Sequence, residues 1–142
     1  LPIIVTRPFN YTGVGQSSSF LIPKMIDHVR RRAPQIELGN LDVARDFSDV
    51  RMVVDAYARL LEEPAAIGGT FNVCSGEAIS LGQVLDSVRR LSGHDFAVRV
   101  NPAFVRADEV KTLCGDATRI QSVIGPLARV PLDETLRWML AA

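Results

Sequence analysis

Short apolar runs alternate with amphipathic segments along this chain. Residues 3–6 and 70–74 are predicted to be buried strands, because each run is rich in β-branched and other apolar side chains and is bounded by Pro or Gly. Residues 35–38 form a shorter predicted strand, and residues 96–100 have the mixed polarity of an edge strand. Segments with apolar residues three or four positions apart separate these strands. This alternation predicts an α/β fold.

The first two predicted helices are marked by residues that favour helix N-termini. The serines at 17–19 can cap a helix over residues 20–32, and Ser48 or Asp49 can cap a second helix that ends before Pro64. The apolar residues of the second helix fall on one expected buried stripe: Val50, Val53, Val54, Tyr57 and Leu61.

The clearest local signal is a capping box at residues 80–83. The hydroxyl of Ser80 can accept a hydrogen bond from the backbone of Gln83, whose side chain can reach back to the start of the helix. Gly93 supplies a left-handed residue that ends this helix. Two more helices are expected, a short one capped by Asp116 and an amphipathic one over residues 132–140.

The domain organisation follows from the length and from the strands. The chain has 142 residues, of which 47% are hydrophobic, so it is rich enough in apolar side chains to form a core and has the length of one domain or of part of a larger one. Only residues 3–6 and 70–74 look like buried parallel strands, and two strands cannot shield both edges of a sheet. Because the chain also opens directly on a strand-like run, we expect it to be the C-terminal part of a longer protein.

Charge and composition exclude several classes of partner. Sixteen basic and sixteen acidic residues cancel, which argues against nucleic acid or an anionic membrane as the main partner. The longest apolar run, residues 1–5, is far shorter than the about 20 residues that cross a membrane. No signal-peptide pattern is present, so a cytoplasmic location is expected. The two cysteines, Cys74 and Cys114, are too few for a disulfide framework or a zinc cluster.

Two signatures of redox enzymes are absent from the sequence. Gly13 and Gly15 would need a third glycine at position 18, where Ser18 stands, so they do not form a dinucleotide fingerprint. Neither Tyr11 nor Tyr57 is followed by a lysine four residues later, so no tyrosine–lysine proton-transfer pair is present. We therefore predict no catalytic residue and no metal site in this chain.

Arg45 and Arg106 are the candidate binding residues. Both are expected in loops, Arg45 just before a helix and Arg106 after the edge strand, three residues before Glu109. A guanidinium group can hold a phosphate through two parallel hydrogen bonds, and a carboxylate can bind the two hydroxyls of a ribose. One interpretation is therefore a clamp for a nucleoside diphosphate. The other is a structural ion pair, Arg45 with Asp46 or Arg106 with Asp108.

Five motifs, in this order, resemble those of the extended short-chain dehydrogenase/reductases that act on nucleotide sugars. They are RPFN with TG and GQ at residues 7–16, RDFSDVR at 45–51, TFNVCSG at 70–76, RADEV with a later GD and Arg at 106–119, and PLDETL at 131–136. The opening motif, with Thr12 and Gln16, is most similar to the branch that reduces GDP-4-keto-6-deoxymannose, close to the GDP-mannose 4,6-dehydratases. The resemblance covers nearly the whole chain.

The resemblance implies a Rossmann domain that binds NAD(P)(H) and a smaller α/β domain that binds a GDP-sugar or another nucleotide sugar. It places Pro8 and Phe9 near the nicotinamide, Asn10 on the sugar or phosphate, Arg45 and Arg106 on the diphosphate, and Glu109 on the ribose. Lys24 either lines the nucleotide pocket or is a solvated surface lysine. Ala107 stands where the family usually has proline, which loosens the loop that carries Arg106.

The resemblance also implies that different segments of this chain belong to two parts of the intact enzyme. Enzymes of this family are commonly homodimers. Residues 1–16 and about 44–76 would contribute to the Rossmann sheet, and residues about 17–43 and 77–142 would form the substrate-binding part. The glycine fingerprint and the Tyr-x-x-x-Lys pair precede the RPFN strand in this family, so the cofactor is expected to bind mainly to an N-terminal half, and the isolated chain to be inactive.

The expected activity of the intact protein is reduction of a GDP-4-keto-6-deoxyhexose. A GDP-mannose 4,6-dehydratase or a UDP-sugar 4-epimerase of the same family is the enzymatic alternative. A nucleotide-binding module without catalytic activity is the other alternative. The sequence does not distinguish NADH from NADPH, because the residues that would do so lie outside it.

Overall fold

The computed structural model describes residues 1–105 and 108–142, and it confirms the α/β class. The strands are β1 (Val5–Pro8), β2 (Asn10–Thr12), β3 (Gln35–Leu38), β4 (Ala44–Asp49), β5 (Thr70–Val73), β6 (Ala78–Ser80), β7 (Ala97–Val100) and β8 (Thr112–Leu113). The α-helices are α1 (Leu21–Arg30), α2 (Val50–Glu62), α3 (Leu81–Ser92), α4 (Thr118–Ile124) and α5 (Leu132–Ala141). None of these helices is both long enough and apolar enough to cross a lipid bilayer.

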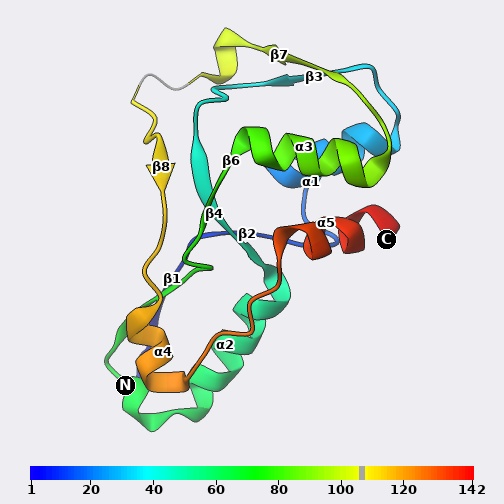
Figure 1. Cartoon of the computed structure of the whole chain (residues 1–142). Coiled ribbons are helices and arrows are strands. Elements are labelled where there is room, and N and C mark those ends of the chain that lie inside the picture. Colours follow the sequence, from blue (N-terminus) through cyan, green and yellow to red (C-terminus); the bar gives the residue numbers. More distant parts are fainter. Residues whose placement is uncertain (106–107) are drawn as a thin grey trace.

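Strand β4 joins the two ends of the molecule (Figure 1). Its first residues pair antiparallel with β6 and parallel with β8, and its last residues pair parallel with β2. In this register Arg45 lies opposite Leu113, and Asn10 lies opposite Phe47. Two further parallel pairs, β1 with β5 and β3 with β7, lie at opposite ends of the fold. Segments far apart in the sequence therefore meet along β4.

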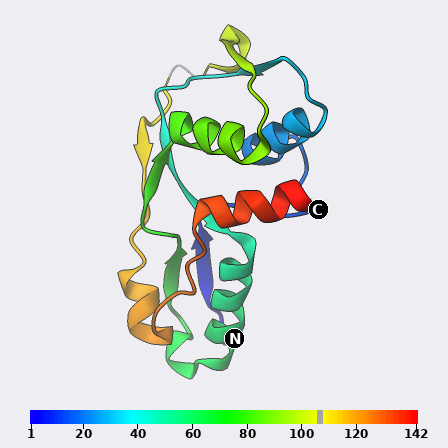
Figure 2. The same cartoon turned by 45° about the vertical axis from the view of Figure 1, so that its right-hand side comes forward.

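The apolar side chains form two separate clusters. One lies among α1, α3 and α5, where Met25, Val84 and Leu136 are completely or almost completely buried. The other lies among α2, α4 and β5, where Ala56 and Ile120 are completely buried. Figures 1 and 2 both show α5 between α3 of the first cluster and α2 of the second. The predicted assignment of segments to a Rossmann sheet and a substrate-binding part stays a prediction.

The first strand differs from the expected buried strand over residues 3–6. Strand β1 begins at Val5 and includes Pro8 as its last residue, opposite Val73 of β5. Most of its side chains are exposed, and among the described residues only β5 pairs with it. Proline is tolerated at position 8 because the bonds to β5 do not need its N–H. In the described residues, Val5 and Phe9 donate to the carbonyls of Gly69 and Val73 instead.

Helix α1 begins without the predicted serine cap. The extended residue before the helix is Phe20, and its side chain makes no capping hydrogen bond. Ser17 and Ser19 bond to each other instead, at 2.9 Å between the hydroxyl oxygens. In contrast, the capping box of Ser80 and Gln83 is confirmed at the start of α3, and Gly93 ends that helix with a φ of 61°. The difference is that the box is specified by two side chains, whereas a run of serines fixes no single cap position.

Helix α2 has the predicted N-cap, but the side of the helix that is buried differs from the predicted one. Asp49 accepts a hydrogen bond from the backbone of Arg51, as predicted. The buried residues are Met52, Val53, Ala56 and Leu60, whereas Val54 and Leu61 of the expected stripe are 61% and 82% exposed. Small Ala56, which is completely buried, lets the helix pack closely against its neighbours, so the buried face is set by close packing rather than by the largest apolar residues.

Candidate functional site

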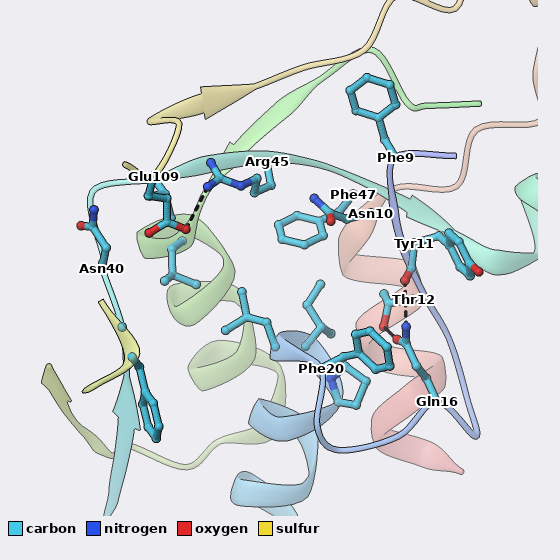
Figure 3. Close-up of a pocket in the computed structure, with 17 residues that line it drawn as sticks. Phe9, Asn10, Tyr11, Thr12, Gln16, Phe20, Asn40, Arg45, Phe47 and Glu109 are labelled. Carbon is cyan, nitrogen blue, oxygen red and sulfur yellow. Dashed lines mark hydrogen bonds and ion pairs between the residues drawn. The ribbon is translucent and has the colours of Figure 1, made fainter. Parts of the chain in front are cut away.

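A cavity of about 490 Å³ lies between β2, β4 and the start of α1 (Figure 3). Aromatic rings and polar side chains alternate around it: Phe9, Tyr11, Phe20, Phe47 and Phe104, with Asn10, Gln16, Asn40, Arg45 and Glu109. A cavity of this size with a few convergent polar groups has the properties of a small-molecule binding site.

Strand alternation explains which residues of β4 reach the cavity. Arg45 and Phe47 both line it, whereas Asp46 and Ser48, between and beside them, are buried and do not. Successive side chains on a strand point to opposite faces, so this pattern is the one a strand imposes. The expectation that Arg45 lies in a loop is therefore wrong. Pairing of β4 with β6 and β8 holds this polar segment in extended form, which its own composition does not indicate.

Arg45 and Glu109 form an ion pair at the wall of the cavity (Figure 3). The distance from Arg45 Nη2 to Glu109 Oε1 is 3.0 Å, and the side chains are only 17% and 21% exposed. Arg45 Nη1 also donates to the carbonyl oxygens of Ala44 and Lys111, at 2.9 and 3.2 Å. The alternative pair of Arg45 with Asp46 is not formed among the described residues.

The guanidinium group of Arg45 keeps capacity for a ligand. It carries five N–H donors, and three of them have partners within residues 1–105 and 108–142. The group is already largely withdrawn from water and faces the carboxylate of Glu109. The unused N–H donors of this group can therefore bind an anion without a large new loss of hydration.

The opposite end of the cavity presents amides and a hydroxyl. Thr12 Oγ1 donates to Gln16 Oε1 at 2.8 Å, and Gln16 Nε2 donates to the carbonyl of Tyr11 at 3.1 Å. These bonds fix Gln16 against β2. Asn10 of the same strand also lines the cavity, and its amide lies next to the ring of Phe47 in Figure 3. Amides and hydroxyls both donate and accept hydrogen bonds, so this end suits a ligand rich in hydroxyl groups.

The structure brings four of the sequence-predicted site residues to one cavity. Phe9, Asn10, Arg45 and Glu109 all line it. Pro8 lies one residue outside, in β1. Arg106 falls outside the described residues, so its predicted convergence with Arg45 stays a prediction.

Lys24 contacts the cavity wall from behind. Its Nζ donates to the carbonyl of Glu37 at 2.7 Å and lies 4.8 Å from the ring centre of Phe104, which lines the cavity. The side chain therefore supports an aromatic wall residue through a cation–π contact, and its ammonium group has a backbone partner.

Several cavity residues were not predicted from the sequence: Tyr11, Gln16, Phe20, Asn40, Phe47 and Phe104. Phe47 could have been found, because a strand that presents Arg45 to a cavity presents the residue two positions later to the same side. Phe20 and Phe104 come from separate segments, and no local pattern relates them to Arg45.

We expect the two cysteines to differ sharply in reactivity. Cys74 is buried, and burial together with the nearby carboxylate of Asp46 raises its pKa to about 11, whereas Cys114 is exposed. Because the thiolate is the reactive form, a disulfide reagent at neutral pH should label Cys114 in the folded protein and both cysteines only after unfolding. Rapid labelling of Cys74 in the native C114S variant would contradict this packing.

The sequence was compared with families and with known proteins. The sequence profile of the family described as GDP-mannose 4,6 dehydratase matches residues 1–139. A GDP-6-deoxy-D-talose 4-dehydrogenase of Aggregatibacter actinomycetemcomitans is 37% identical over 123 residues, which is 87% of this chain and 42% of that protein. A GDP-6-deoxy-D-mannose reductase of Pseudomonas aeruginosa is 31% identical over 144 residues, which is 98% of this chain and 47% of that protein.

Solved structures share the fold. A Burkholderia cenocepacia J2315 protein of proposed epimerase activity is 54% identical with a TM-score of 0.95, over 99% of this chain and 46% of that one. The RMD protein of Pseudomonas aeruginosa, solved with NADPH, is 28% identical with a TM-score of 0.87, over 99% of this chain and 47% of that one.

These matches confirm the resemblance to nucleotide-sugar short-chain dehydrogenase/reductases and the fold class that it implied. The chain spans less than half the length of the relatives it matches. Since the family profile extends over nearly all of its residues, the chain belongs to the GDP-mannose 4,6 dehydratase family.

Proposed function

We propose that this chain is the substrate-binding portion of an NAD(P)-dependent reductase of a GDP-4-keto-6-deoxyhexose. The observation that carries the proposal is the mostly buried guanidinium group of Arg45, which faces a polar cavity and keeps donors for an anion. Family membership and two relatives named for GDP-6-deoxyhexose oxidation or reduction support the substrate class.

Each end of the cavity has a role in this proposal. The diphosphate takes the place of the Glu109 carboxylate on Arg45, and the released carboxylate binds the ribose hydroxyls. The hexose extends toward Asn10, at the end of the cavity that presents amides. Arg106 is proposed as a second cation on the diphosphate.

The proposed cofactor contacts this chain only at its nicotinamide end. The ring of Phe9 follows β1 and lines the cavity beside Asn10, so it offers a flat apolar surface next to the proposed sugar position. The sequence has no glycine fingerprint and no Tyr-x-x-x-Lys pair to hold the rest of the cofactor. NAD(P)H, when bound, supplies hydride to the C4 ketone, and the residues of this chain bind and orient the sugar nucleotide. The family resemblance adds a homodimeric, cytoplasmic enzyme to the proposal.

Binding and turnover test the proposal separately. Residues 1–142 alone should bind GDP in calorimetry and should not oxidise NADPH in the presence of GDP-4-keto-6-deoxymannose. The protein at its full natural length should oxidise NADPH with that substrate, and should leave GDP-mannose and UDP-glucose unchanged. NADPH oxidation by residues 1–142 alone would show that the chain is not only a binding portion. Failure of the full-length protein to bind GDP would refute the proposed substrate class.

A further inference from the structure

Asp46 is a completely buried carboxylate surrounded by backbone donors. Its Oδ1 accepts from the backbone N–H of Ser75 at 2.8 Å and from the Ser75 hydroxyl at 2.7 Å. Its Oδ2 accepts from the N–H groups of Gly76 and Gly115, at 2.9 and 3.2 Å. One side chain of β4 therefore joins the turn after β5 and the segment after β8, neither of which is adjacent to it in the sequence.

The segment around Gly115, which Asp46 binds, also packs against Phe9 in the wall of the cavity. A β-carbon on Gly115 would lie 2.5 Å from Cys74 Sγ and 3.0 Å from Cε2 of Phe9, so the backbone at Gly115 lies very close to both side chains. Phe9 lines the cavity. The hydrogen bond between Asp46 and Gly115 thus fixes a backbone segment against a wall residue.

The same segment carries Glu109 toward Arg45. Ala44 N–H donates to the carbonyl of Lys111 at 2.7 Å, and Arg45 pairs with Leu113 in the parallel ladder of β4 and β8. The chain from Lys111 to Gly115 is therefore attached to β4 at its beginning by these bonds and at its end by Asp46. Glu109 lies two residues before this attached stretch, so its carboxylate is placed by the attachment.

We propose that Asp46 is a positioning residue of the cavity, whose buried carboxylate fixes Arg45 and Glu109 relative to each other by tying three chain segments together. The inference rests on the proposed function, since it assigns Asp46 a role in nucleotide binding. Asp46 itself does not line the cavity and acts through Arg45 and Glu109, which do.

An Asp46→Asn variant tests this role with little change in shape. The amide nitrogen of asparagine is a donor, and it would face N–H groups that now donate to a carboxylate oxygen. In the full-length protein we expect D46N to weaken GDP binding about tenfold in calorimetry. Asp49→Asn is the matched control, because Asp49 is an equally buried carboxylate of the same strand whose partners, Arg51 and Thr135, lie outside the cavity. D49N should change GDP affinity by less than about twofold at a temperature where both variants are folded.

A double-mutant cycle separates positioning from general destabilisation. In an R45M background, the effect of D46N on GDP affinity should shrink from about tenfold to about threefold or less, because only the part that passes through Glu109 remains. Three results would each overturn the proposal. The first is an undiminished effect of D46N in R45M, and the second is wild-type GDP affinity in folded D46N. The third is an equal loss of GDP affinity in D46N and D49N.

Two further measurements keep the test decisive. If D46N does not fold, S75A removes only the hydroxyl donor to Asp46 and should weaken GDP binding about two- to threefold, and unchanged affinity would overturn the proposal. If the wild-type protein binds no GDP, the proposed function fails, and crystal structures of D46N or S75A decide the positioning role. Loss of the 3.0 Å contact between Arg45 and Glu109 supports it, and its retention overturns it.

Discussion

Replacing Arg45 with methionine is expected to weaken GDP binding by about one to two orders of magnitude. Methionine keeps an apolar stem in the wall of the cavity and removes the charged donors that would contact the diphosphate. Hydrogen bonds to charged groups contribute about 1.5–3 kcal/mol each, and 1.4 kcal/mol corresponds to about tenfold in affinity. Isothermal titration of the full-length protein with GDP measures the effect directly.

Two comparisons separate loss of the phosphate contact from loss of structure. Guanosine has no phosphate, so its affinity should change little between wild type and R45M. Arg90→Met is the matched control, because Arg90 also pairs with a carboxylate, Asp133, and lies outside the cavity. R90M should bind GDP like the wild type. Equal GDP affinity in R45M and wild type, or an equal loss in R90M, would show that Arg45 does not bind the diphosphate.

Replacing Asp49 with alanine is expected to lower the free energy of unfolding by about 3 kcal/mol. The side chain of Asp49 is completely buried and accepts hydrogen bonds from Arg51 and Thr135. Its loss removes the N-cap of α2 and leaves the buried hydroxyl of Thr135 without this acceptor. The contact with Thr135 also joins α5 to the end of β4, so the loss affects both sides of the fold. Urea unfolding at neutral pH measures the change.

The pH dependence of stability gives a second test of Asp49. Burial alone would raise the pKa of this carboxyl, but hydrogen bonds from Arg51 and Thr135 outweigh burial and hold the pKa below its usual value of 3.8. A group with a lower pKa in the folded than in the unfolded state stabilises the fold above its unfolded pKa, and this contribution disappears as the pH falls through the folded pKa. The difference in stability between wild type and D49A should therefore be constant near neutral pH and shrink below about pH 4.

Asp116 provides the control for Asp49. Its pKa is also lowered, by hydrogen bonds from Thr118, but the side chain is exposed and, within the described residues, has no buried partner. Asp116→Ala should lower stability far less than D49A. Similar losses in the two variants, or a difference between wild type and D49A that does not shrink in acid, would contradict the role of Asp49 as a buried link.

The parts of the fold that the sequence predicted correctly depend on neighbouring residues. Ser80 and Gln83 specify a helix start within four positions, and Gly93 specifies its end by the sterics of a left-handed residue. The strand over residues 35–38 was found for the same reason, because its apolar alternation is local. The family motifs located Asn10, Arg45 and Glu109, which line one cavity.

The parts that were missed depend on residues far apart in the chain. Arg45 lies in a strand because β6 and β8 pair with it, and its ion-pair partner Glu109 is 64 positions away. The buried face of α2 follows the close packing at Ala56, which a count of large apolar residues does not reveal. The sequence offered Asp46 as an ion-pair partner of Arg45, whereas its backbone partners come from two distant segments.

A crystal structure of the full-length protein with GDP would show whether Arg45 holds the diphosphate. We expect the diphosphate within hydrogen-bond distance of the Arg45 guanidinium, with the Glu109 carboxylate moved from Arg45 to the ribose hydroxyls. A nucleotide bound elsewhere, with the Arg45–Glu109 pair still at 3.0 Å, would contradict it.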